Sequence, residues 1–393
     1  MDTSLYLSTL VELTGVYGSP YCIWLGPVPV VIVSTAEHAR TILTAPGTVE
    51  KASFYRFTPL RGIFALPAHK WRVHRRVIQP SFKPSILRGF VPLFVEKADG
   101  MVRALSDMAE CGQTFDIYRL FEIVTIRAVN IFLHPQWLYR WTAVYRKEAK
   151  ALEEFCRPSK AILAENTHSK AGSAIENDKR FNLVEHLKSS MPDKEDIEHE
   201  LNTIIFAGNE TSAMTVANTL LLLAMHPLVQ EKLFEELNVH CGSEISCEML
   251  KNLHYLEQVL KESLRLLPIA AVIGRRTTEE LRVGEHRLPA NVDVIIDIFD
   301  IHRNPAYWGP DADTFRPERF DGLRYDPFTL LPFSAGPRNC VGLRYAWISM
   351  KIMLLKVLTR FRIETDLRME DLNMKIALTM KITNGHMVRL RRR

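Results

Sequence analysis

The sequence lacks the features that would place it in several large classes of protein. Its six cysteines are scattered and include no Cys-x-x-Cys pair, so they indicate neither a disulfide scaffold nor a zinc site and fit a reducing compartment. Charge of one sign is not in large excess, because the formal net charge is +5 and the only run of three basic residues lies at 391–393. Nucleic acid is therefore not expected as a partner.

A long hydrophobic run is missing from the N-terminal part of the chain. A membrane-spanning helix needs about 18 to 20 predominantly apolar residues, whereas residues 1–25 are interrupted by charged residues, glycines and a proline. The longest apolar stretch, residues 21–33, is broken by Gly26, Pro27 and Pro29 and predicts two strands joined by a turn. We expect neither a cleavable signal nor a membrane span in this sequence.

The hydrophobic pattern predicts a mainly α-helical fold with a minor β component. Helices are expected at 36–43, where Thr35 would be the cap, at 193–225 and at 252–266, with helical patterning also dominating from 70 to about 161. The predicted β component comprises a hairpin at 23–33 and hairpin turns at 288–292 and 384–385. The polar, aperiodic residues 167–179 predict a mobile surface loop.

Cys340 lies in a predicted loop, residues 332–342, that contains two glycines. The loop directly precedes an apolar helical stretch that begins near Leu343. The N-terminus of a helix favours the thiolate form of a cysteine, through its dipole and its free N–H groups, and Arg338 adds a cation nearby. A thiolate is a soft, electron-rich metal ligand. The alternative is a buried structural cysteine at a loop-to-helix junction.

The spacing Phe-x-x-Gly-x-Arg-x-Cys-x-Gly in this loop resembles the haem-binding loop of the cytochrome P450 family, where a cysteine thiolate is the axial iron ligand. The resemblance implies haem b (iron protoporphyrin IX) as the cofactor, with Cys340 as the metal ligand. Phe333 would lie against the thiolate side of the haem. Gly336 would permit a tight turn that a Cβ would block, and Gly342 would let the following helix approach the porphyrin closely.

A second motif lies in the middle of the long helix predicted at 193–225. Ala207, Gly208, Glu210 and Thr211 match the family pattern Ala/Gly-Gly-x-Asp/Glu-Thr. By resemblance, Thr211 would hydrogen-bond the oxygen bound to iron, and Glu210 would help to relay protons inward. The alternative is a helix contact made by small residues, in which Thr211 bonds the carbonyl four residues earlier.

The resemblance also implies a buried ion network with a structural role. Glu262 and Arg265 are three residues apart and share one face of a predicted helix. In the family such a pair meets an arginine from a later Pro-Glu-Arg-Phe segment, which here contains Arg319. The three residues would hold the haem-loop region in place.

Cofactor contacts are implied for four further residues. Trp71 and Arg75 are four residues apart on a predicted helix, so both could face one ligand. In the family this pair reaches a haem propionate, and Arg338 and Arg275 would hold the propionates from other sides.

Basic residues on a neighbouring face of that helix have two interpretations. Lys70, Arg72, Arg76 and Lys83 would be exposed, either as a docking patch for an acidic electron donor or as a merely solvated face.

The family motifs occur in family order from Trp71 to Cys340, which implies one cytochrome P450 domain over residues 1–393. By the same resemblance, we expect the sequence to begin just past the membrane anchor and hinge of eukaryotic members. Residues 125–130 resemble the start of one family helix, whereas residues 133–137 resemble a segment that lies much further along in the family. The resemblance therefore implies that most of two helices near residue 130 are missing. The amino-acid sequence around Cys340 most resembles insect members of the branch that includes fatty-acid ω-hydroxylases. In many of those a glutamate esterifies the haem, and here Ala207 occupies that position.

The function implied is a haem-thiolate monooxygenase that inserts one oxygen atom of O2 into an apolar organic substrate. NADPH-cytochrome P450 reductase would supply electrons, with cytochrome b5 as an optional second donor, to a monomer at the cytoplasmic face of the endoplasmic reticulum membrane. Substrate contacts would come from near Phe64, the Ala207 helix, residues 269–273 and the Thr383 hairpin.

Two other functions stay open. The missing helices suggest a truncated, catalytically silent haem-binding protein. A relative that rearranges peroxides without a reductase is less favoured, because Thr211 and Glu210 are both present.

Overall fold

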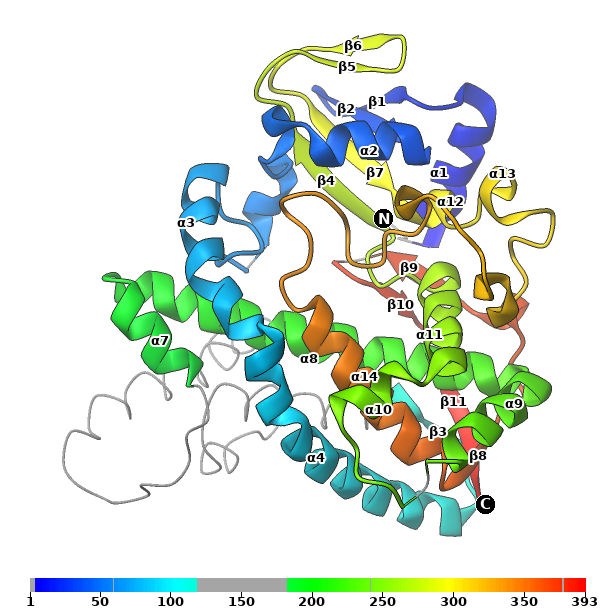
Figure 1. Ribbon diagram of the computed structural model, residues 1–393. Coiled ribbons are helices and arrows are strands. Elements are labelled where there is room, and N and C mark those ends of the chain that lie inside the picture. The colour runs from blue at the N-terminus through cyan, green and yellow to red at the C-terminus, as the bar shows by residue number, and fades with distance from the viewer. Residues whose placement is uncertain (1–3, 59, 119–181, 241, 377) are drawn as a thin grey trace.

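The computed structural model describes residues 4–58, 60–118, 182–240, 242–376 and 378–393 (Figure 1). The predicted segments at 125–137 and 167–179 lie outside the described residues. The described part is mainly helical with a minor β component, as predicted. Its α-helices are α1 (Ser4–Tyr17), α2 (Ala36–Thr44), α3 (Ala68–Ile78), α4 (Pro84–Cys111), α7 (Leu183–Ser190), α8 (Lys194–Met225), α9 (Pro227–Asn238), α10 (Cys247–Lys251), α11 (His254–Leu266), α12 (Ile298–Ile301), α13 (Pro305–Trp308) and α14 (Leu343–Leu358).

The strands form small sheets beside the helices. One sheet has the order β1-β2-β7-β4, in which β2 and β7 are parallel and the other neighbours antiparallel. A second has the order β3-β11-β8, and β5-β6 and β9-β10 form two-stranded pairs. The strands are β1 (Tyr21–Leu25), β2 (Val28–Val33), β3 (Phe115–Asp116), β4 (Val272–Arg276), β5 (Leu281–Val283), β6 (His286–Leu288), β7 (Asp293–Asp297), β8 (Phe361–Glu364), β9 (Met374–Ile376), β10 (Met380–Ile382) and β11 (Met387–Arg392).

Helix ends follow the predicted capping chemistry. The Thr35 hydroxyl oxygen accepts a hydrogen bond from the His38 N–H at 3.3 Å and caps α2. Asp193 caps α8 by accepting from the Glu195 N–H at 2.9 Å, and acidic residues occupy the first turn. Both helices therefore begin where the sequence predicts.

Two predicted hairpin turns are wrong. Residues 288–292 connect β6 to β7, which belong to different sheets, and Asn384-Gly385 connects β10 to β11, which also pair with other strands. At both turns pairing with a distant part of the chain overrides the local signal.

The helical patterning predicted from residue 70 is confirmed by α3 and α4, after which the short strand β3 pairs with β11. From residue 119 to 161 this prediction lies outside the described residues.

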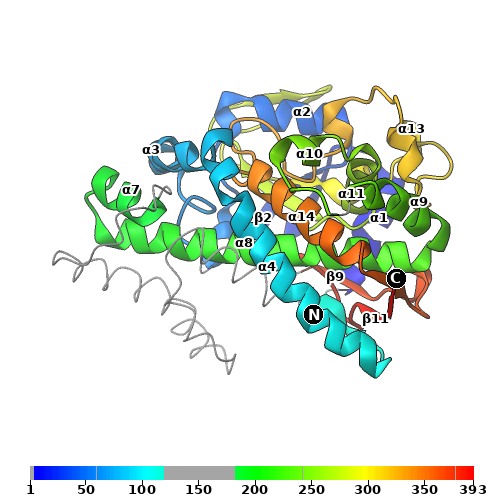
Figure 2. The same cartoon turned by 60° about the horizontal axis from the view of Figure 1, so that its bottom comes forward.

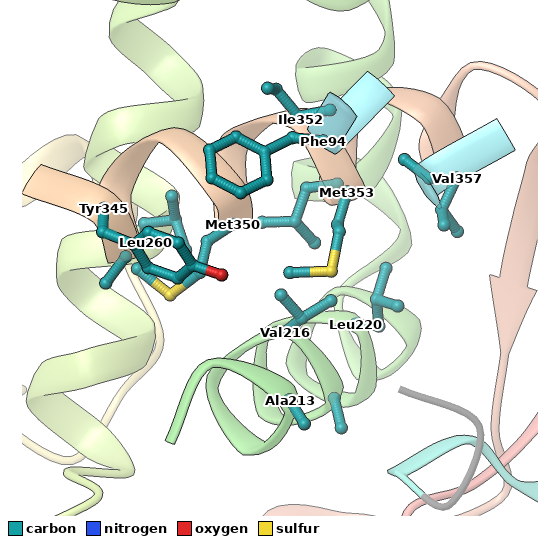
Figure 3. Close-up of a cluster of buried hydrophobic side chains, with 14 of the residues drawn as sticks. Phe94, Ala213, Val216, Leu220, Leu260, Tyr345, Met350, Ile352, Met353 and Val357 are labelled. Atoms are coloured by element: carbon teal, nitrogen blue, oxygen red, sulfur yellow. The ribbon is translucent and has the colours of Figure 1, made fainter. Parts of the chain in front are cut away.

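The core is built where α14 crosses α8 and packs against α4, as Figures 1 and 2 show. In Figure 3, Met353 of α14 points toward Val216 of α8, and both side chains are buried. The ring of Phe94 on α4 meets that of Tyr345 on α14 edge to face, with centroids 5.1 Å apart. Burying such a side chain stabilises the fold by about 1.5–3 kcal/mol, so this crossing fixes α8 relative to the loop that precedes α14.

The described residues were not found to contain a single helix that could span a membrane. No single helix there combines enough length with enough hydropathy, and α8 and α9 do so only as a pair that is bent by 116°.

Candidate functional site

A largely apolar cavity of about 310 Å³ lies between α8, α3, β4 and the loop that carries Cys340. We call it the central cavity. Most of the residues predicted as functional from the sequence line it. These are Trp71, Arg75, Thr211, Arg275, Phe333, Arg338, Cys340 and Gly342.

The Cys340 loop is a tight turn that backbone contacts hold in place. The Cys340 N–H donates to the carbonyl oxygen of Phe333 at 3.0 Å. Gly336 has φ +72°, and a Cβ there would lie 1.9 Å from the carbonyl oxygen of Leu43. Only glycine fits this position, because both the conformation and the close approach exclude a side chain.

The position of Gly342 differs, because a Cβ there would meet the Cys340 Sγ and the Phe82 ring at 3.9 Å, an ordinary contact distance. Packing within the protein does not demand glycine at this site. Its predicted role, a close approach of α14 to the cofactor, stays a prediction.

The Cys340 side chain is accessible because it faces the central cavity, although protein atoms surround the thiol. Burial raises the pKa of the thiol, while the Gly342 N–H and the charge of Arg75 act in the opposite direction to a smaller extent. The nearby cation is thus Arg75, whereas Arg338 donates to the carbonyl oxygens of Val49 and Leu66. The expectation that Arg338 acts on the thiol is corrected, since its guanidinium is directed elsewhere.

Helix α3 is attached to the Cys340 loop through Arg75. This side chain donates to the carbonyl oxygen of Asn339 at 2.8 Å and to its side-chain oxygen at 2.9 Å. The guanidinium carbon of Arg338 lies 5.1 Å from the centre of the Trp71 ring, within cation–π distance. Trp71 and Arg75 therefore reach the same wall of the cavity, as their spacing predicts.

Besides Arg75, three cations line the central cavity, and within the described part of the chain none of the three makes an ion pair with a carboxylate. They are Lys51, Arg275 and Arg338. Burial lowers the pKa of Lys51 well below its usual value, and Arg275 and Arg338 lower it further. Burial and the charge of Arg275 likewise lower the pKa of Arg338 to about 10, and its buried Nε has no hydrogen-bond partner among the described residues.

These unpaired cations fit a cofactor that carries carboxylates, because a buried charge without a partner is costly. Elsewhere the described residues contain no cluster of three or more His, Cys, Asp and Glu side chains that could hold a metal ion. A thiol that faces a cavity suits a metal whose other ligands come from the cofactor itself. Haem, with its porphyrin nitrogens and two propionates, matches this set of residues.

Sequence reasoning missed Lys51. Its Nζ lies 4.2 Å from the ring centre of Tyr55 and 4.9 Å from that of Phe64. Nothing in the adjacent sequence distinguishes this lysine from a surface lysine. Only the packing of residues 52–55 against β4 reveals it.

Thr211 lines the cavity, and its hydroxyl donates to the carbonyl oxygen of Ala207, four residues earlier, at 2.7 Å. This is the contact of the alternative interpretation. It does not exclude a functional role, since a hydroxyl that donates its proton keeps lone pairs that can accept. The oxygen of Thr211 is thus an oriented acceptor on the cavity wall.

Glu210 is directed toward the β9–β10 hairpin and is not among the residues that line the cavity. Its Oε1 lies 2.6 Å from Nζ of Lys381 and accepts from the Thr379 hydroxyl at 3.2 Å. Its Oε2 is buried and has no hydrogen-bond partner among the described residues. Since the Lys381 side chain is 48% exposed, Glu210 connects α8 to the protein surface.

Glu262, Arg265 and Arg319 meet in the interior of the protein. Glu262 accepts from Arg265 at 2.8 and 2.9 Å and from Arg319 at 2.8 Å. Both arginines also donate to backbone carbonyls, including that of His302 at 2.8 Å from Arg265. The network is therefore fully enclosed by hydrogen bonds, as a buried ion network must be.

His302 connects this network to the Cys340 loop. Its Nε2 accepts from the Leu331 N–H at 2.7 Å, and its Nδ1 donates to the carbonyl oxygen of Arg265 at 3.2 Å. Burial lowers the pKa of His302 to about 3, so the ring is neutral and can accept at Nε2. The network thus holds the strand of chain that leads into Phe333.

The predicted substrate contacts are partly as expected. Phe64, Ala207, Ile269 and Ile273 line the central cavity, but Thr383 does not. Leu378 and Thr379, between β9 and β10, take its place. The hairpin that reaches the cavity is thus the one formed by β9 and β10, which precedes the predicted turn at 384–385, because the pairing of these strands is not visible in the sequence.

The predicted basic residues on and after α3 are exposed. Lys70, Arg72, Arg76 and Lys83 all reach the surface, and Lys70 lies 3.9 Å from Asp196. Their role as a docking patch stays a prediction.

Comparison with known proteins places these features in a family. The family model described as cytochrome P450 matches residues 4–134 and 117–388. The chain is 30% identical to cytochrome P450 4V2 of Homo sapiens, over 94% of this chain and 82% of that protein. It is 30% identical to probable cytochrome P450 313a4 of Drosophila melanogaster, over 94% of this chain and 86% of that protein. Relatives from an insect agree with the resemblance of the Cys340 loop to insect sequences.

Proposed function

The chain belongs to the cytochrome P450 family, and from this premise we propose that it is a monooxygenase that inserts one oxygen atom of O2 into an apolar organic substrate. The observation that carries the proposal is that Cys340, Thr211 and three unpaired cations line one apolar cavity. This reaction requires three things of the protein: a thiol that binds the iron, an oriented hydroxyl, and cations that bind the carboxylates of the cofactor.

The cofactor is proposed to be haem b, with Cys340 as its axial ligand. When bound, the haem would supply the activation of O2 with two electrons, favoured by the electron density of the thiolate. Lys51, Arg275 and Arg338 would bind the propionates. Arg75 would hold the Cys340 loop through Asn339 and keep a positive charge near the thiolate.

Proton delivery is proposed to follow α8. Glu210 would take protons from the surface, where Lys381 is half exposed, and its buried Oε2 is free to bind one. The Thr211 oxygen, fixed by its bond to Ala207, would accept a hydrogen bond on the cavity side. This path needs Glu210 to turn away from Lys381, since the two are paired in the structure.

The substrate is proposed to be apolar, because Leu60, Phe64, Ile269 and Leu378 line the cavity. Ala207 has no carboxylate, so esterification of the haem from this position is excluded. Electrons would come from NADPH-cytochrome P450 reductase, with cytochrome b5 as an optional donor, at the exposed basic residues around α3. Residence at the cytoplasmic face of the endoplasmic reticulum membrane is part of the same proposal and follows from family resemblance.

The test is the carbon monoxide difference spectrum of the reduced, purified chain. We expect a Soret band at the position typical of thiolate-ligated haem, and its loss in Cys340→Ala, while Cys247→Ala on α10 leaves it unchanged. Turnover of an apolar substrate with NADPH and the reductase should follow. Correct haem ligation without any product would contradict the monooxygenase and favour a silent haem-binding protein.

Thr211→Val distinguishes oxygen activation from the rearrangement of peroxides. If Thr211 serves oxygen activation, this variant consumes NADPH without forming product, whereas Thr219→Val, which removes the same kind of i−4 bond outside the cavity, keeps the two coupled. Unchanged product formation by Thr211→Val without a reductase would favour rearrangement.

A further inference from the structure

A buried carboxylate on α8 binds two parts of the structure at once. Glu200 has no exposed surface, and its Oε1 lies 2.6 Å from Nδ1 of His74 on α3. Its Oε2 accepts from the backbone N–H of Ile63 at 2.8 Å. One side chain thus connects α8, α3 and the segment that contains residues 62–64.

This segment forms part of the cavity wall. Ile63 and Phe64 line the central cavity, whereas His74 and Glu200 are not among its lining residues. Residues 62–66 make a turn of their own, in which the N–H groups of Ala65 and Leu66 donate to the Gly62 carbonyl at 3.0 and 3.2 Å. The turn carries Ile63 and Phe64 but has no strand or long helix to place it.

Contacts to α8 place the segment instead. The Gly62 N–H donates to the Thr203 hydroxyl at 3.0 Å, and the next N–H, of Ile63, donates to Glu200. Gly62 lies so close to α8 that a Cβ would be 2.6 Å from the carbonyl oxygen of His199. Two successive N–H groups therefore hold the turn at one point along α8.

Glu200 can do this because His74 completes its hydrogen bonding. A carboxylate with no access to water must be compensated, and the only ionisable partner within hydrogen-bond distance among the described residues is His74. The ring is held on its other side by Asp196, 3.5 Å from Nε2, and Lys70 lies 3.9 Å from that same carboxylate. His74 also directly precedes Arg75, which binds the Cys340 loop.

We propose that His74 and Glu200 are a positioning pair that holds residues 62–64 against α8 and so sets how tightly the cavity binds an apolar ligand. The pair acts through Ile63 and Phe64 and touches no ligand itself. The ligand part of this inference rests on the proposed function, whereas the placement of the segment does not.

Amide hydrogen exchange tests the placement on the purified chain. In Glu200→Ala and His74→Ala, the N–H of Ile63 loses its acceptor or the partner that orients the acceptor, so exchange in a peptide covering residues 60–66 should accelerate about 5- to 10-fold, the effect of losing one hydrogen bond. Glu200→Gln keeps an acceptor and should restore much of the protection. Glu195→Ala and His69→Ala, exposed positions on the same two helices, are the matched controls and should not change this peptide.

Ligand binding tests the consequence. n-Octylamine, an apolar chain with a nitrogen that can bind haem iron, is titrated into the haem-loaded variants and followed by the Soret shift. We expect its Kd to rise about 5- to 10-fold in Glu200→Ala, with partial recovery in Glu200→Gln and no change in the two controls. The carbon monoxide band should keep its position, because Cys340 is untouched.

Each result decides between the inference and its rejection. Exchange at residues 60–66 that matches the controls in both alanine variants overturns the inference, as does an unchanged Kd together with accelerated exchange. If the alanine variants do not fold, His74→Gln and Glu200→Gln give the same comparison with smaller expected effects. If the chain binds no haem, the proposed function fails, and the exchange comparison still decides the placement.

Discussion

Two glycines of the Cys340 loop differ in what constrains them. At Gly336 the positive φ and the Leu43 carbonyl exclude any side chain, whereas at Gly342 the protein leaves room for a Cβ. The fold of the chain itself therefore requires glycine at position 336. At position 342 a requirement for glycine would have to come from the bound cofactor.

A pair of alanine substitutions separates these requirements. We expect Gly336→Ala to abolish folded, haem-binding protein, since a left-handed conformation costs about 1–2 kcal/mol and the overlap with backbone adds more. Gly342→Ala should leave the melting temperature of the haem-free chain unchanged within error but weaken haem binding. Soluble yield, melting temperature and haem titration measure both effects. Equal haem affinity in Gly342→Ala and the unmodified chain would contradict the role proposed for this glycine.

Lys51 provides a second prediction for a single residue. Its lowered pKa reflects burial near two arginines, a situation that a propionate would relieve. We expect Lys51→Met to release haem faster, by about tenfold for the loss of one charged hydrogen bond, when a haem scavenger is added in excess. Lys83→Met, an exposed lysine after α3, is the control and should release haem at the original rate. An unchanged rate in Lys51→Met would remove Lys51 from the set of propionate ligands.

Between elements, the ion network joins α11 to the segments around His302 and Arg319. Glu262 is buried and is bonded to two arginines that are themselves buried. Removing the carboxylate leaves two enclosed positive charges, and His302 then loses the support that holds Leu331 in front of the Cys340 loop.

Glu262→Ala should therefore lower the free energy of unfolding by about 3–5 kcal/mol. Glu248→Ala, which breaks an exposed pair with Lys251 on α10, should change it by about 0.5 kcal/mol or less. Chemical denaturation of both variants measures the difference. A small effect of Glu262→Ala would mean that the network does not carry the stability of this region.

The contact between α3 and α8 should depend on pH. The hydrogen bond to Glu200 raises the pKa of His74, an effect that the charge of Asp196 increases and that burial and Lys70 oppose. A group whose pKa is raised in the folded state stabilises that state when it is protonated. The stabilisation is complete below the ordinary histidine value of about 6.5 and is lost as the pH rises through the higher folded-state pKa.

The difference in unfolding free energy between the unmodified chain and His74→Gln should accordingly be largest below about pH 6.5 and shrink as the pH rises above that value. Denaturation at a series of pH values measures it, with His69→Gln as the exposed control on α3. A difference that grows with pH would contradict protonated His74 as the stabilising form.

At the scale of the whole molecule, the central cavity joins regions that are distant in the sequence. Its walls come from α3, α8, β4, the β9–β10 hairpin and the Cys340 loop. A cofactor held at all of these places stabilises their common arrangement, because a ligand that binds only the folded state shifts the folding equilibrium.

Haem should therefore raise the melting temperature of the entire chain in one transition. At 1,000 times the dissociation constant the gain is about 4 kcal/mol. Calorimetry with and without haem measures it, and Cys340→Ala should show a smaller shift. Separate transitions for the β1–β7 sheet and for the α8–α14 core would show that the cavity does not couple them.

The segment near residue 130 concerns the whole molecule as well. Two parts of the family model match overlapping residues, 4–134 and 117–388, and the alignment to a second Drosophila relative, probable cytochrome P450 313b1, extends over 455 positions for a chain of 393 residues. The overlap places a discontinuity of the family match at residues 117–134, and that most of two helices are missing here stays a prediction. The region itself lies outside the described residues.

The sequence alone predicted local features of the chain, such as helix caps and a glycine turn. Thr35 and Asp193 identify the starts of α2 and α8, and the turn at Gly336 follows from its glycine, because capping and turn formation depend on a few neighbouring residues. The order of the motifs likewise identified the family.

Only the tertiary structure decided which distant groups meet. It brought Lys51 to the cavity, turned Arg338 away from the thiol, paired Glu210 with Lys381 and joined Glu200 to both His74 and Ile63. It also gave β7 and β11 partners other than the strands that precede them. The physical reason is that the direction of a buried charge and the register of a strand depend on partners far along the chain, which local sequence patterns do not contain.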